Sequence, residues 1–152
     1  MVDISDAFLY GIVDLGYVDK SQVVGMARSL LDGGVGVLQL RAKAHQPDAL
    51  LPLAILLREA CDEFSIPFVV NDHVNLARDC RAHGLHLGQD DGGLLAARED
   101  LEDGVIIGRS THSVEQAESA LEEGADYIGF GPLFPTPTKE GRPAIGLSDI
   151  SE

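Results

Sequence analysis

The sequence is poor in positive charge and in cysteine, and it lacks any long apolar run. Its 11 lysines and arginines stand against 25 acidic residues, and the net charge of −14 argues against a nucleic-acid or anionic-membrane partner. No stretch approaches the roughly 18 apolar residues that a membrane span needs. Cys61 and Cys80 lie far apart in segments with helical patterns, so we expect two small buried side chains in a reducing compartment.

The opening residues, MVDISDAFLYG, are acidic where a signal peptide is basic, so we expect no export and a cytoplasmic location. The chain of 152 residues is long enough for one ordinary hydrophobic core, and we expect residues 1–152 to form a single domain. An acidic protein that binds phosphates must gather its few cations locally or recruit a metal ion.

Short apolar segments alternate with amphipathic segments along the chain. Six of the apolar segments are typical of strands: 8–13, 35–40, 68–70, 85–87, 105–107 and 127–130. Helices are expected at 19–31, 47–61, 74–81, 94–101 and 113–121, with Asp19 and Ser113 as N-caps of the first and last. The apolar faces of these two helices would consist of Val23, Met26, Ala27, Leu30 and Leu31, and of Ala117, Ala120 and Leu121. The alternation predicts βαβ units around a parallel sheet, an α/β fold.

Polar residues follow the C-terminal ends of nearly all the predicted strands. They are Asp14, Gln39 with Arg41 and Lys43, Asn71 with Asp72, Gln89 with Asp91, Ser110, and Thr136 to Lys139. An open doubly wound sheet collects ligand groups from two or three strands, whereas a barrel collects them from all strands at one face. The distribution therefore favours a TIM (β/α)8 barrel.

Only about six βα units of such a barrel are present, and strands 7 and 8 are missing from the sequence. Closed barrels of this kind usually need about 200 residues or more. Residues 147–150 resemble the beginning of another helix with a serine cap. We therefore expect a fragment rather than a natural short form, and the exposed edges of a six-stranded sheet would favour a homo-oligomer.

The segment GFGPLFPTPTK, from Gly129 to Lys139, leaves the last predicted strand. Gly129 and Gly131 would let backbone amides approach a ligand, and the three prolines would stiffen the loop. Amide and hydroxyl donors with one fixed positive charge suit a phosphate. The alternative is a rigid turn after a buried strand.

The segment QLRAK, from Gln39 to Lys43, alternates along the second predicted strand. Gln39, Arg41 and Lys43 would point to one face, with Leu40 and Ala42 on the other. Three donors, two of them cationic, suit a pyrophosphate. A solvated strand end is the alternative.

Asn71-Asp72 and Asp91 end neighbouring predicted strands, so their side chains could converge. Carboxylates with waters and a ligand phosphate are the usual arrangement around Mg²⁺. The alternative is that Asp72 and Asp91 cap the helices that follow them. His83 and His86 would lie on opposite faces, which argues against a shared zinc site.

Five motifs, taken together, resemble those of the thiamine-phosphate synthase family, also called thiamine-phosphate pyrophosphorylases. They are QLRAK (39–43), VVNDHVNLA (69–77), GLHLGQDD (84–91), IIGRSTHS (106–113) and GADYIGFGPLFPTPTK (124–139). The resemblance extends from Leu9 to about Ile150. It implies a (β/α)8 barrel and a transferase of thiamine biosynthesis. Such an enzyme joins 4-amino-2-methyl-5-hydroxymethylpyrimidine diphosphate to a thiazole phosphate and releases pyrophosphate.

The resemblance also implies roles for individual residues. Asp72 and Asp91 would bind Mg²⁺, and the segment Thr136-Pro137-Thr138 would face the thiazole phosphate. The pyrimidine diphosphate would be held by the QLRAK segment (Gln39, Leu40, Arg41, Ala42, Lys43) with Asn71, Ser110 and Lys139. The catalytic candidates, which would stabilise the leaving pyrophosphate, are Arg41, Lys43, Ser110 and Lys139. The family's seventh and eighth strands complete the thiazole-phosphate site, and this sequence contains neither.

Two other functions stay open. A thiazole tautomerase is a related barrel in which a histidine at the position of His112 moves a proton, but that branch tends to lose the diphosphate and magnesium residues that are kept here. A lone loop histidine is more often structural. The second alternative is a truncated, non-catalytic protein that binds phosphate or thiamine.

Overall fold

A single parallel sheet of six strands organises the computed structural model, which describes residues 4–136 and 144–151. The strands are β1 (Tyr10–Asp14), β2 (Val37–Arg41), β3 (Phe68–Asn71), β4 (Gly84–Leu87), β5 (Ile106–Thr111) and β6 (Tyr127–Phe130). The α-helices are α1 (Val23–Asp32), α2 (Pro47–Glu63), α3 (Val74–Asp79), α4 (Leu94–Asp100) and α5 (Val114–Glu122), and a 3₁₀ helix, η1, spans Ser148–Ser151. The predicted alternation of strand and helix is therefore confirmed.

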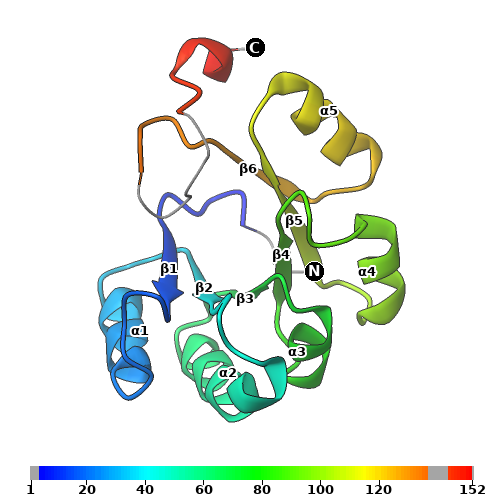
Figure 1. Cartoon of the computed structure of the whole chain (residues 1–152). Coiled ribbons are helices and arrows are strands. Elements are labelled where there is room, and N and C mark those ends of the chain that lie inside the picture. Colours follow the sequence, from blue (N-terminus) through cyan, green and yellow to red (C-terminus); the bar gives the residue numbers. More distant parts are fainter. Residues whose placement is uncertain (1–3, 137–143, 152) are drawn as a thin grey trace.

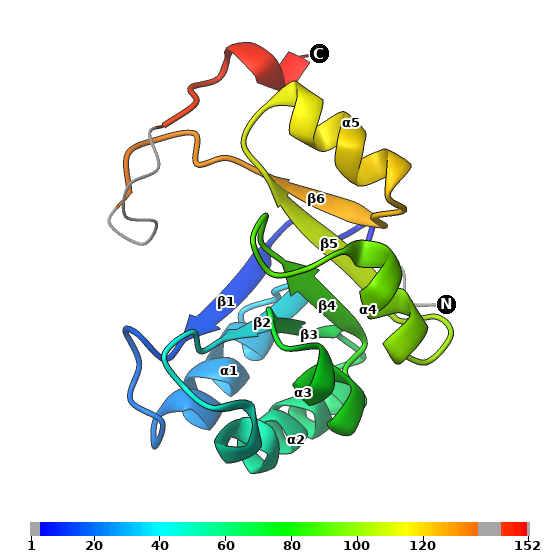
Figure 2. The ribbon, with the colours of Figure 1, turned by 45° about the vertical axis from the view of Figure 1, so that its right-hand side comes forward.

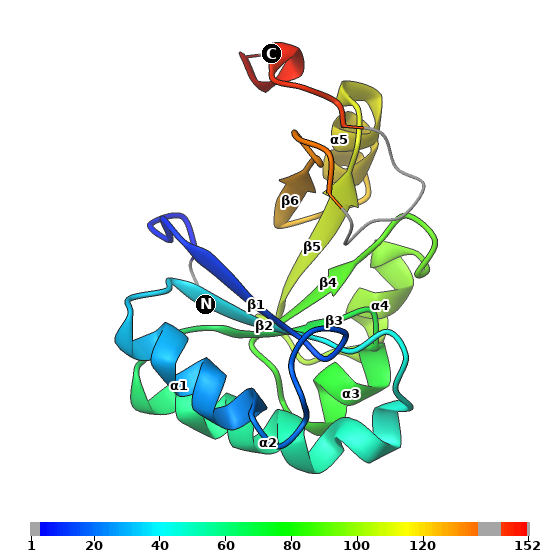
Figure 3. The same ribbon diagram turned by 60° about the vertical axis from the view of Figure 1, so that its left-hand side comes forward.

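The strands lie in the sheet in the same order as in the chain, from β1 to β6. Each crossover between parallel neighbours is expected to be right-handed, so successive crossovers in one direction put their helices on one face of the sheet. Figures 1 and 2 show α1 to α5 outside a curled sheet, and Figure 3 shows β1 with α1 at one end and β6 with α5 at the other. The result is a curled half-barrel, which differs from an open doubly wound sheet with helices on both faces.

The hydrophobic core lies between the sheet and its helices. From the strands it receives Leu38, Leu40, Phe68, Val70, Leu85, Leu87 and Ile107, and from α2 it receives Leu50, Leu53, Ala54, Leu57 and Cys61. Every residue of β3 and β4 is buried, so neither strand has an exposed face. Strands buried on both faces appear in a sequence as continuous apolar runs.

Several element boundaries differ from the predicted ones. The first strand begins at Tyr10 instead of residue 8, and Phe8 is fully exposed. Helix α1 begins at Val23 because Asp19 belongs to a turn, in which its carbonyl accepts a hydrogen bond from Gln22 N. Strand β5 continues to Thr111 because residues 108–111 pair with β6.

Two predicted core residues lie at the surface. Met26 on α1 is 45% exposed and Leu121 on α5 is 73% exposed, whereas the neighbouring Ala27 and Ala120 are buried. Helix α5 is the last of the row, and its inner side packs on the sheet while Leu121 is left exposed. The predicted N-cap of α5 is confirmed, since the Ser113 hydroxyl accepts a hydrogen bond from Gln116 N.

Cys61 and Cys80 are buried free thiols, as predicted. Burial raises the pKa of Cys61 to about 12 and that of Cys80 to about 11, so both stay protonated at neutral pH. None of the helices in the described part of the chain has the length and apolar content of a membrane span.

His83, just before β4, gives the fold a predictable dependence on pH. Its Nδ1 accepts a hydrogen bond from Phe68 N at 3.1 Å, and its Nε2 lies 3.2 Å from Asp62 Oδ1. Burial lowers the pKa of His83 below its usual value of about 6.5, and Asp62 opposes that shift. The stability that neutral His83 contributes is therefore present above about pH 6.5 and is lost as the pH falls through the lower, folded-state pKa.

When the pH is lowered from 7 to 5, we expect the free energy of unfolding of His83→Asn to fall less than that of the unsubstituted protein. The asparagine oxygen can replace Nδ1 as the acceptor for Phe68 N, but it does not bind a proton in this range. Urea midpoints at the two pH values measure the difference. Equal losses in both proteins would show that His83 does not contribute.

Candidate functional site

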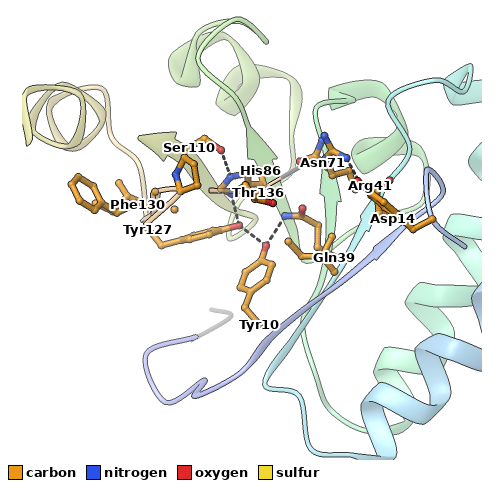
Figure 4. A pocket seen from close by; sticks show the side chains of 16 residues that line it. Tyr10, Asp14, Gln39, Arg41, Asn71, His86, Ser110, Tyr127, Phe130 and Thr136 are labelled. Carbon is orange, nitrogen blue, oxygen red and sulfur yellow. Dashed lines mark hydrogen bonds and ion pairs between the residues drawn. The ribbon is translucent and has the colours of Figure 1, made fainter. Parts of the chain in front are cut away.

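A cavity of about 660 Å³ opens on the concave, helix-free side of the sheet. All six strands contribute to its walls, and β3 does so only through its last residue, Asn71. The lining residues are Tyr10, Ile12, Asp14, Tyr17, Gln39, Arg41, Asn71, His86, Ser110, Tyr127, Ile128, Gly129, Phe130, Gly131, Pro132 and Thr136. Figure 4 shows Tyr10, Gln39, His86, Ser110 and Tyr127 pointing toward one another from different strands, with Asp14 and Arg41 side by side.

Five of the predicted binding residues line this cavity: Gln39, Arg41, Asn71, Ser110 and Thr136. Leu40 and Ala42 do not: the alternation along β2 places the Leu40 side chain in the core at 2% exposure, and Ala42, just after the strand, is buried in the same core at 3%. A ligand at this end of the sheet could meet only their backbone. Pro137, Thr138 and Lys139 lie outside the described residues.

Arg41 lies at the end of β2 beside Asp14, the last residue of β1. The register pairs the two residues, and the Arg41 guanidinium donates a hydrogen bond to the Asp14 carboxylate in an ion pair. The side chains keep 22% and 14% of their exposure, respectively. Asp14 therefore fixes the position of the guanidinium at the wall of the cavity.

Lys43 does not continue the row of Gln39 and Arg41. Strand β2 ends at Arg41, so the alternation stops and Lys43 belongs to the turn that follows. Its Nζ lies 3.4 Å from Asp72 Oδ2, and its side chain is 55% exposed. Lys43 thus joins an acidic cluster beside the cavity and is not one of the cavity's lining residues.

Asp72 and Asp91 interact with each other at the C-terminal ends of β3 and β4. Burial raises the pKa of Asp72, the neighbouring Asp91 carboxylate raises it further, and Lys43 opposes both effects. Asp91 Oδ2 accepts a hydrogen bond from Gly88 N at 2.9 Å. Two acidic groups that share one partly buried place favour a bound proton or cation there.

The alternative prediction, that Asp72 and Asp91 cap the helices that follow them, is wrong. The N-caps of α3 and α4 are His73 and Gly93, and neither helix has a capping hydrogen bond from a side chain. Asp72 also has a φ of 66°, which is uncommon for a residue other than glycine and differs from the extended backbone of the N-caps His73 and Gly93. Within residues 4–136 and 144–151, no group of three or more His, Cys, Asp or Glu side chains is placed to hold a metal ion.

A chain of hydrogen bonds crosses the wall of the cavity from β2 to β5 (Figure 4). Gln39 Nε2 donates to the Tyr10 hydroxyl at 2.8 Å, and the hydroxyls of Tyr10 and Tyr127 lie 2.9 Å apart. The Tyr127 hydroxyl is 3.1 Å from His86 Nδ1, and His86 Nε2 is 2.9 Å from Ser110 Oγ. Burial raises the pKa of both tyrosines, and for Tyr127 the neighbouring Tyr10 adds to the effect. The two phenols are therefore neutral hydroxyls at physiological pH.

Asn71 offers an unused hydrogen-bond donor to the cavity. Asn71 is only 7% exposed, and its side-chain Nδ2 is buried without a hydrogen-bond partner among the described residues. A buried polar group without a partner costs stability, so Asn71 Nδ2 is a donor that a polar ligand or a water in the cavity could satisfy.

Gly108 makes room for the ring of Tyr127. Gly108 lies on β5 and pairs with Tyr127 on the neighbouring strand β6. A Cβ at residue 108 would lie 2.1 Å from Tyr127 Cζ. We expect Gly108→Ala to displace Tyr127, break its contacts with Tyr10 and His86, and lower the free energy of unfolding by about 1–3 kcal/mol.

Chemical denaturation measures this loss, and Gly25→Ala on α1 is the matched control, because a Cβ at Gly25 meets nothing within 4 Å. The control is expected to keep or increase stability. An equal loss in both variants would contradict the assigned role of Gly108.

The loop after β6 is held to β5 by backbone groups. Gly131 N donates to the Thr111 carbonyl at 3.0 Å, so this amide is already used and the expected approach of a ligand to it is not supported. His112 Nδ1 is hydrogen-bonded to the Gly131 carbonyl, and His112 is not one of the lining residues of the cavity. The structure thus gives His112 a place in the support of this loop.

Sequence reasoning missed Tyr10, His86 and Tyr127 as cavity residues. Each was counted only as part of an apolar strand or, for His86, as an improbable zinc ligand. For Tyr10 the signal was present in the spacing, because residues two or four positions before a polar strand end share its face. Tyr10 precedes Asp14 by four residues, and its side chain reaches the same cavity.

Comparison with known proteins agrees with the sequence motifs. A family model described as thiamine monophosphate synthase matches residues 9–152. The thiamine-phosphate synthase of Lawsonia intracellularis is 44% identical over 135 residues, which cover 89% of this chain and 62% of the relative. That of Bacillus mycoides is 45% identical over 132 residues, which cover 82% and 60%.

Solved structures give the same result. Thiamine phosphate pyrophosphorylase from Pyrococcus furiosus superposes with a TM-score of 0.81 and 33% identity, over 93% of this chain and 66% of that chain. The HPPK-DHPS of Plasmodium falciparum, at 11% identity and a TM-score of 0.57, is similar in fold alone. This chain spans about 60% of the length of the curated relatives it matches. It belongs to the thiamine monophosphate synthase family.

Proposed function

We propose that this protein binds a pyrimidine diphosphate and transfers its pyrimidinylmethyl group to a thiazole phosphate, with release of pyrophosphate. The observation that carries the proposal is the convergence of Gln39, Arg41, Asn71, Ser110 and Thr136 on one cavity. Its volume of about 660 Å³ is within the usual range for small-molecule sites. Family membership and the names of the relatives agree with this assignment.

The polar wall of the cavity suits a diphosphate at its rim. Arg41 supplies a positive charge held by Asp14, and Asn71 Nδ2 supplies a buried donor. Ser110 Oγ lies on the same wall. A guanidinium and neutral donors in fixed positions stabilise phosphate oxygens without having to reorganise. We also propose Lys139, Thr138 and Pro137 as binding residues of the loop beyond Thr136.

The aspartate pair fits a magnesium ion shared with a diphosphate. Mg²⁺ is usually held by one or two carboxylates together with waters and substrate phosphates, so the lack of a third acidic ligand among the described residues is no obstacle. The raised pKa of Asp72 and the approach of Lys43 both indicate a place where positive charge is favourable. Bound Mg²⁺ would supply Lewis-acid stabilisation of the charge on the leaving pyrophosphate.

The residues of this chain would then act by electrostatics and positioning. Cleavage of the C–O bond to the diphosphate leaves negative charge on pyrophosphate, and Arg41 and Lys43 stabilise that charge better than the more dispersed charge of the ground state. The aminopyrimidine delocalises the positive charge on the methylene carbon. The thiazole nitrogen then forms the new C–N bond from a position fixed by its own phosphate. No protein nucleophile is needed.

We further propose that the curled sheet is part of a (β/α)8 barrel. The strand order and the single helix-covered face are those of a barrel wall, and the curated relatives are longer than this chain. The single domain, the cytoplasmic location and a homo-oligomer stay predictions.

A turnover assay with both substrates and Mg²⁺ tests the proposed function. Thiamine phosphate and pyrophosphate should form together, and neither should form when Mg²⁺ is removed with a chelator. Isomerised thiazole alone would mean a tautomerase. Mg²⁺-dependent binding of the pyrimidine diphosphate without any product would contradict transfer and leave a binding protein.

A further inference from the structure

Five side chains from five strands form one continuous series of hydrogen bonds in the cavity wall. They are Gln39, Tyr10, Tyr127, His86 and Ser110, and we call this series the relay. Its four donor–acceptor distances lie between 2.8 and 3.1 Å. All five residues line the cavity, so the state of the relay decides which hydrogen-bonding groups the cavity presents.

The Gln39 end fixes the direction of the relay. The amide nitrogen Nε2 can donate a hydrogen bond but cannot accept one, so the Tyr10 oxygen must accept from it. Tyr10 can then give its own proton to the Tyr127 oxygen, and Tyr127 can give its proton to His86 Nδ1. This arrangement leaves neither phenol proton without an acceptor in a buried wall, and each bond polarises the next in the same sense.

His86 converts that direction into a defined tautomer. If Nδ1 accepts from Tyr127, the neutral imidazole carries its proton on Nε2. Nε2–H then donates to Ser110 Oγ, and the proton of the Ser110 hydroxyl is left for the cavity. If the relay ran in the opposite direction, the Ser110 hydroxyl would donate its proton to His86 Nε2. Ser110 Oγ would then present only lone pairs to the cavity.

We propose that His86 is a positioning residue, held as the Nε2–H tautomer by the relay from Gln39, and that it thereby makes Ser110 a dedicated donor to an anionic oxygen of the ligand. That the anionic oxygen belongs to a diphosphate rests on the proposed function. The direction of the relay does not, because it is a property of the protein without ligand. A failure of the relay and a failure of the proposed function are therefore measured separately.

Nitrogen-15 chemical shifts of the histidine rings at pH 8.5 test the proposal, since they distinguish a protonated ring nitrogen from an unprotonated one. Two other histidines are internal references. His83 Nδ1 accepts from the backbone of Phe68, so His83 must be the Nε2–H tautomer. His112 Nδ1 faces the Gly131 carbonyl, which can only accept, so His112 must carry its proton on Nδ1. We expect His86 to match His83.

Gln39→Glu is the decisive variant. An ionised carboxylate can only accept, so Tyr10 donates to it, the whole relay reverses, and His86 should change to the Nδ1–H tautomer and match His112. Gln39→Met removes the end group, and both tautomers of His86 should then be populated. Unchanged shifts of His83 and His112 show that each variant is folded.

Binding of inorganic pyrophosphate with Mg²⁺ provides the functional measurement. Ser110→Ala should weaken it by about tenfold, the value of one charge-assisted hydrogen bond. Tyr127→Phe, which frees the His86 tautomer but leaves Ser110 in place, should weaken it by about twofold, as expected when half of the molecules present the donor. His86 as the Nδ1–H tautomer in the unsubstituted protein, or as Nε2–H in both Gln39 variants, would overturn the proposal.

Discussion

Asp72→Asn is expected to lower turnover by about 100-fold or more and, without Mg²⁺, to raise the melting temperature. The loss of turnover follows because the variant removes one of two carboxylates proposed to hold the metal. The gain in stability follows from the raised pKa of Asp72, which burial and Asp91 cause. Activity and stability should therefore change in opposite directions.

The sign of the stability change can be worked out from the pKa. A carboxyl whose pKa is raised in the folded state holds its proton more tightly there than in the unfolded state. Its contribution to stability is present below the ordinary pKa of 3.8 and is lost as the pH rises through the folded-state value. At neutral pH the ionised Asp72 is a cost, and asparagine removes it. The stability advantage of Asp72→Asn should thus grow from pH 4 to pH 7.

Controls separate a metal site from general electrostatics. Asp90→Asn makes the same charge change at an exposed neighbour of Asp91, and we expect turnover close to that of the unsubstituted protein. Mg²⁺ should raise the melting temperature of the unsubstituted protein and leave that of Asp72→Asn nearly unchanged. If Asp72→Asn lost stability and kept its turnover, the residue would have a structural role only.

Arg41→Gln is expected to lower turnover by about 100-fold and to destabilise the protein by about 1–2 kcal/mol. The first effect is the loss of a positive charge at the cavity wall. The second arises because Asp14 keeps its charge and loses its partner. It is smaller than the roughly 3–5 kcal/mol of fully buried pairs, because both side chains retain some exposure.

A double-mutant cycle with Asp14→Asn distinguishes these two effects. The double variant places two neutral amides where the ion pair was, so its stability should return toward that of the unsubstituted protein. Its turnover should stay as low as that of Arg41→Gln. Asp14→Asn alone keeps the Arg41 guanidinium, so its turnover should fall by about tenfold or less. Recovery of turnover in the double variant would show that Arg41 acts only by supporting the fold.

The sequence predicted the architecture well because local patterns determine it. Alternating apolar strands and amphipathic helices are sufficient for a parallel α/β sheet, and several of the polar strand ends lie in the wall of the cavity. The prediction failed where tertiary contacts decide, as at Leu121, whose exposure depends on the position of α5 at the end of the row. No local pattern contains that information.

The candidate site was predicted in part. Gln39, Arg41, Asn71, Ser110 and Thr136 were named from the motifs, and the structure brings them to one cavity. The alternation expected for QLRAK held only as far as Arg41, because the strand ends there and Lys43 turns toward Asp72.

The relay was not predicted, since it depends on register. Tyr127 lies next to Gly108, and only this pairing leaves space for its ring to reach Tyr10, 117 residues away in the sequence. Side chains that meet across a sheet in this way share no motif. Their common face can be found from the period of two along each strand, but their contacts cannot.

The central claim is that fixed positive charge and a metal site gather at one end of the sheet to bind a departing diphosphate. Calorimetric titration of inorganic pyrophosphate, with and without Mg²⁺, tests it most directly on the unsubstituted protein, Asp72→Asn and Arg41→Gln. Binding should require Mg²⁺ and should weaken by about tenfold or more in each variant. Equal binding by all three proteins, independent of Mg²⁺, would contradict the account.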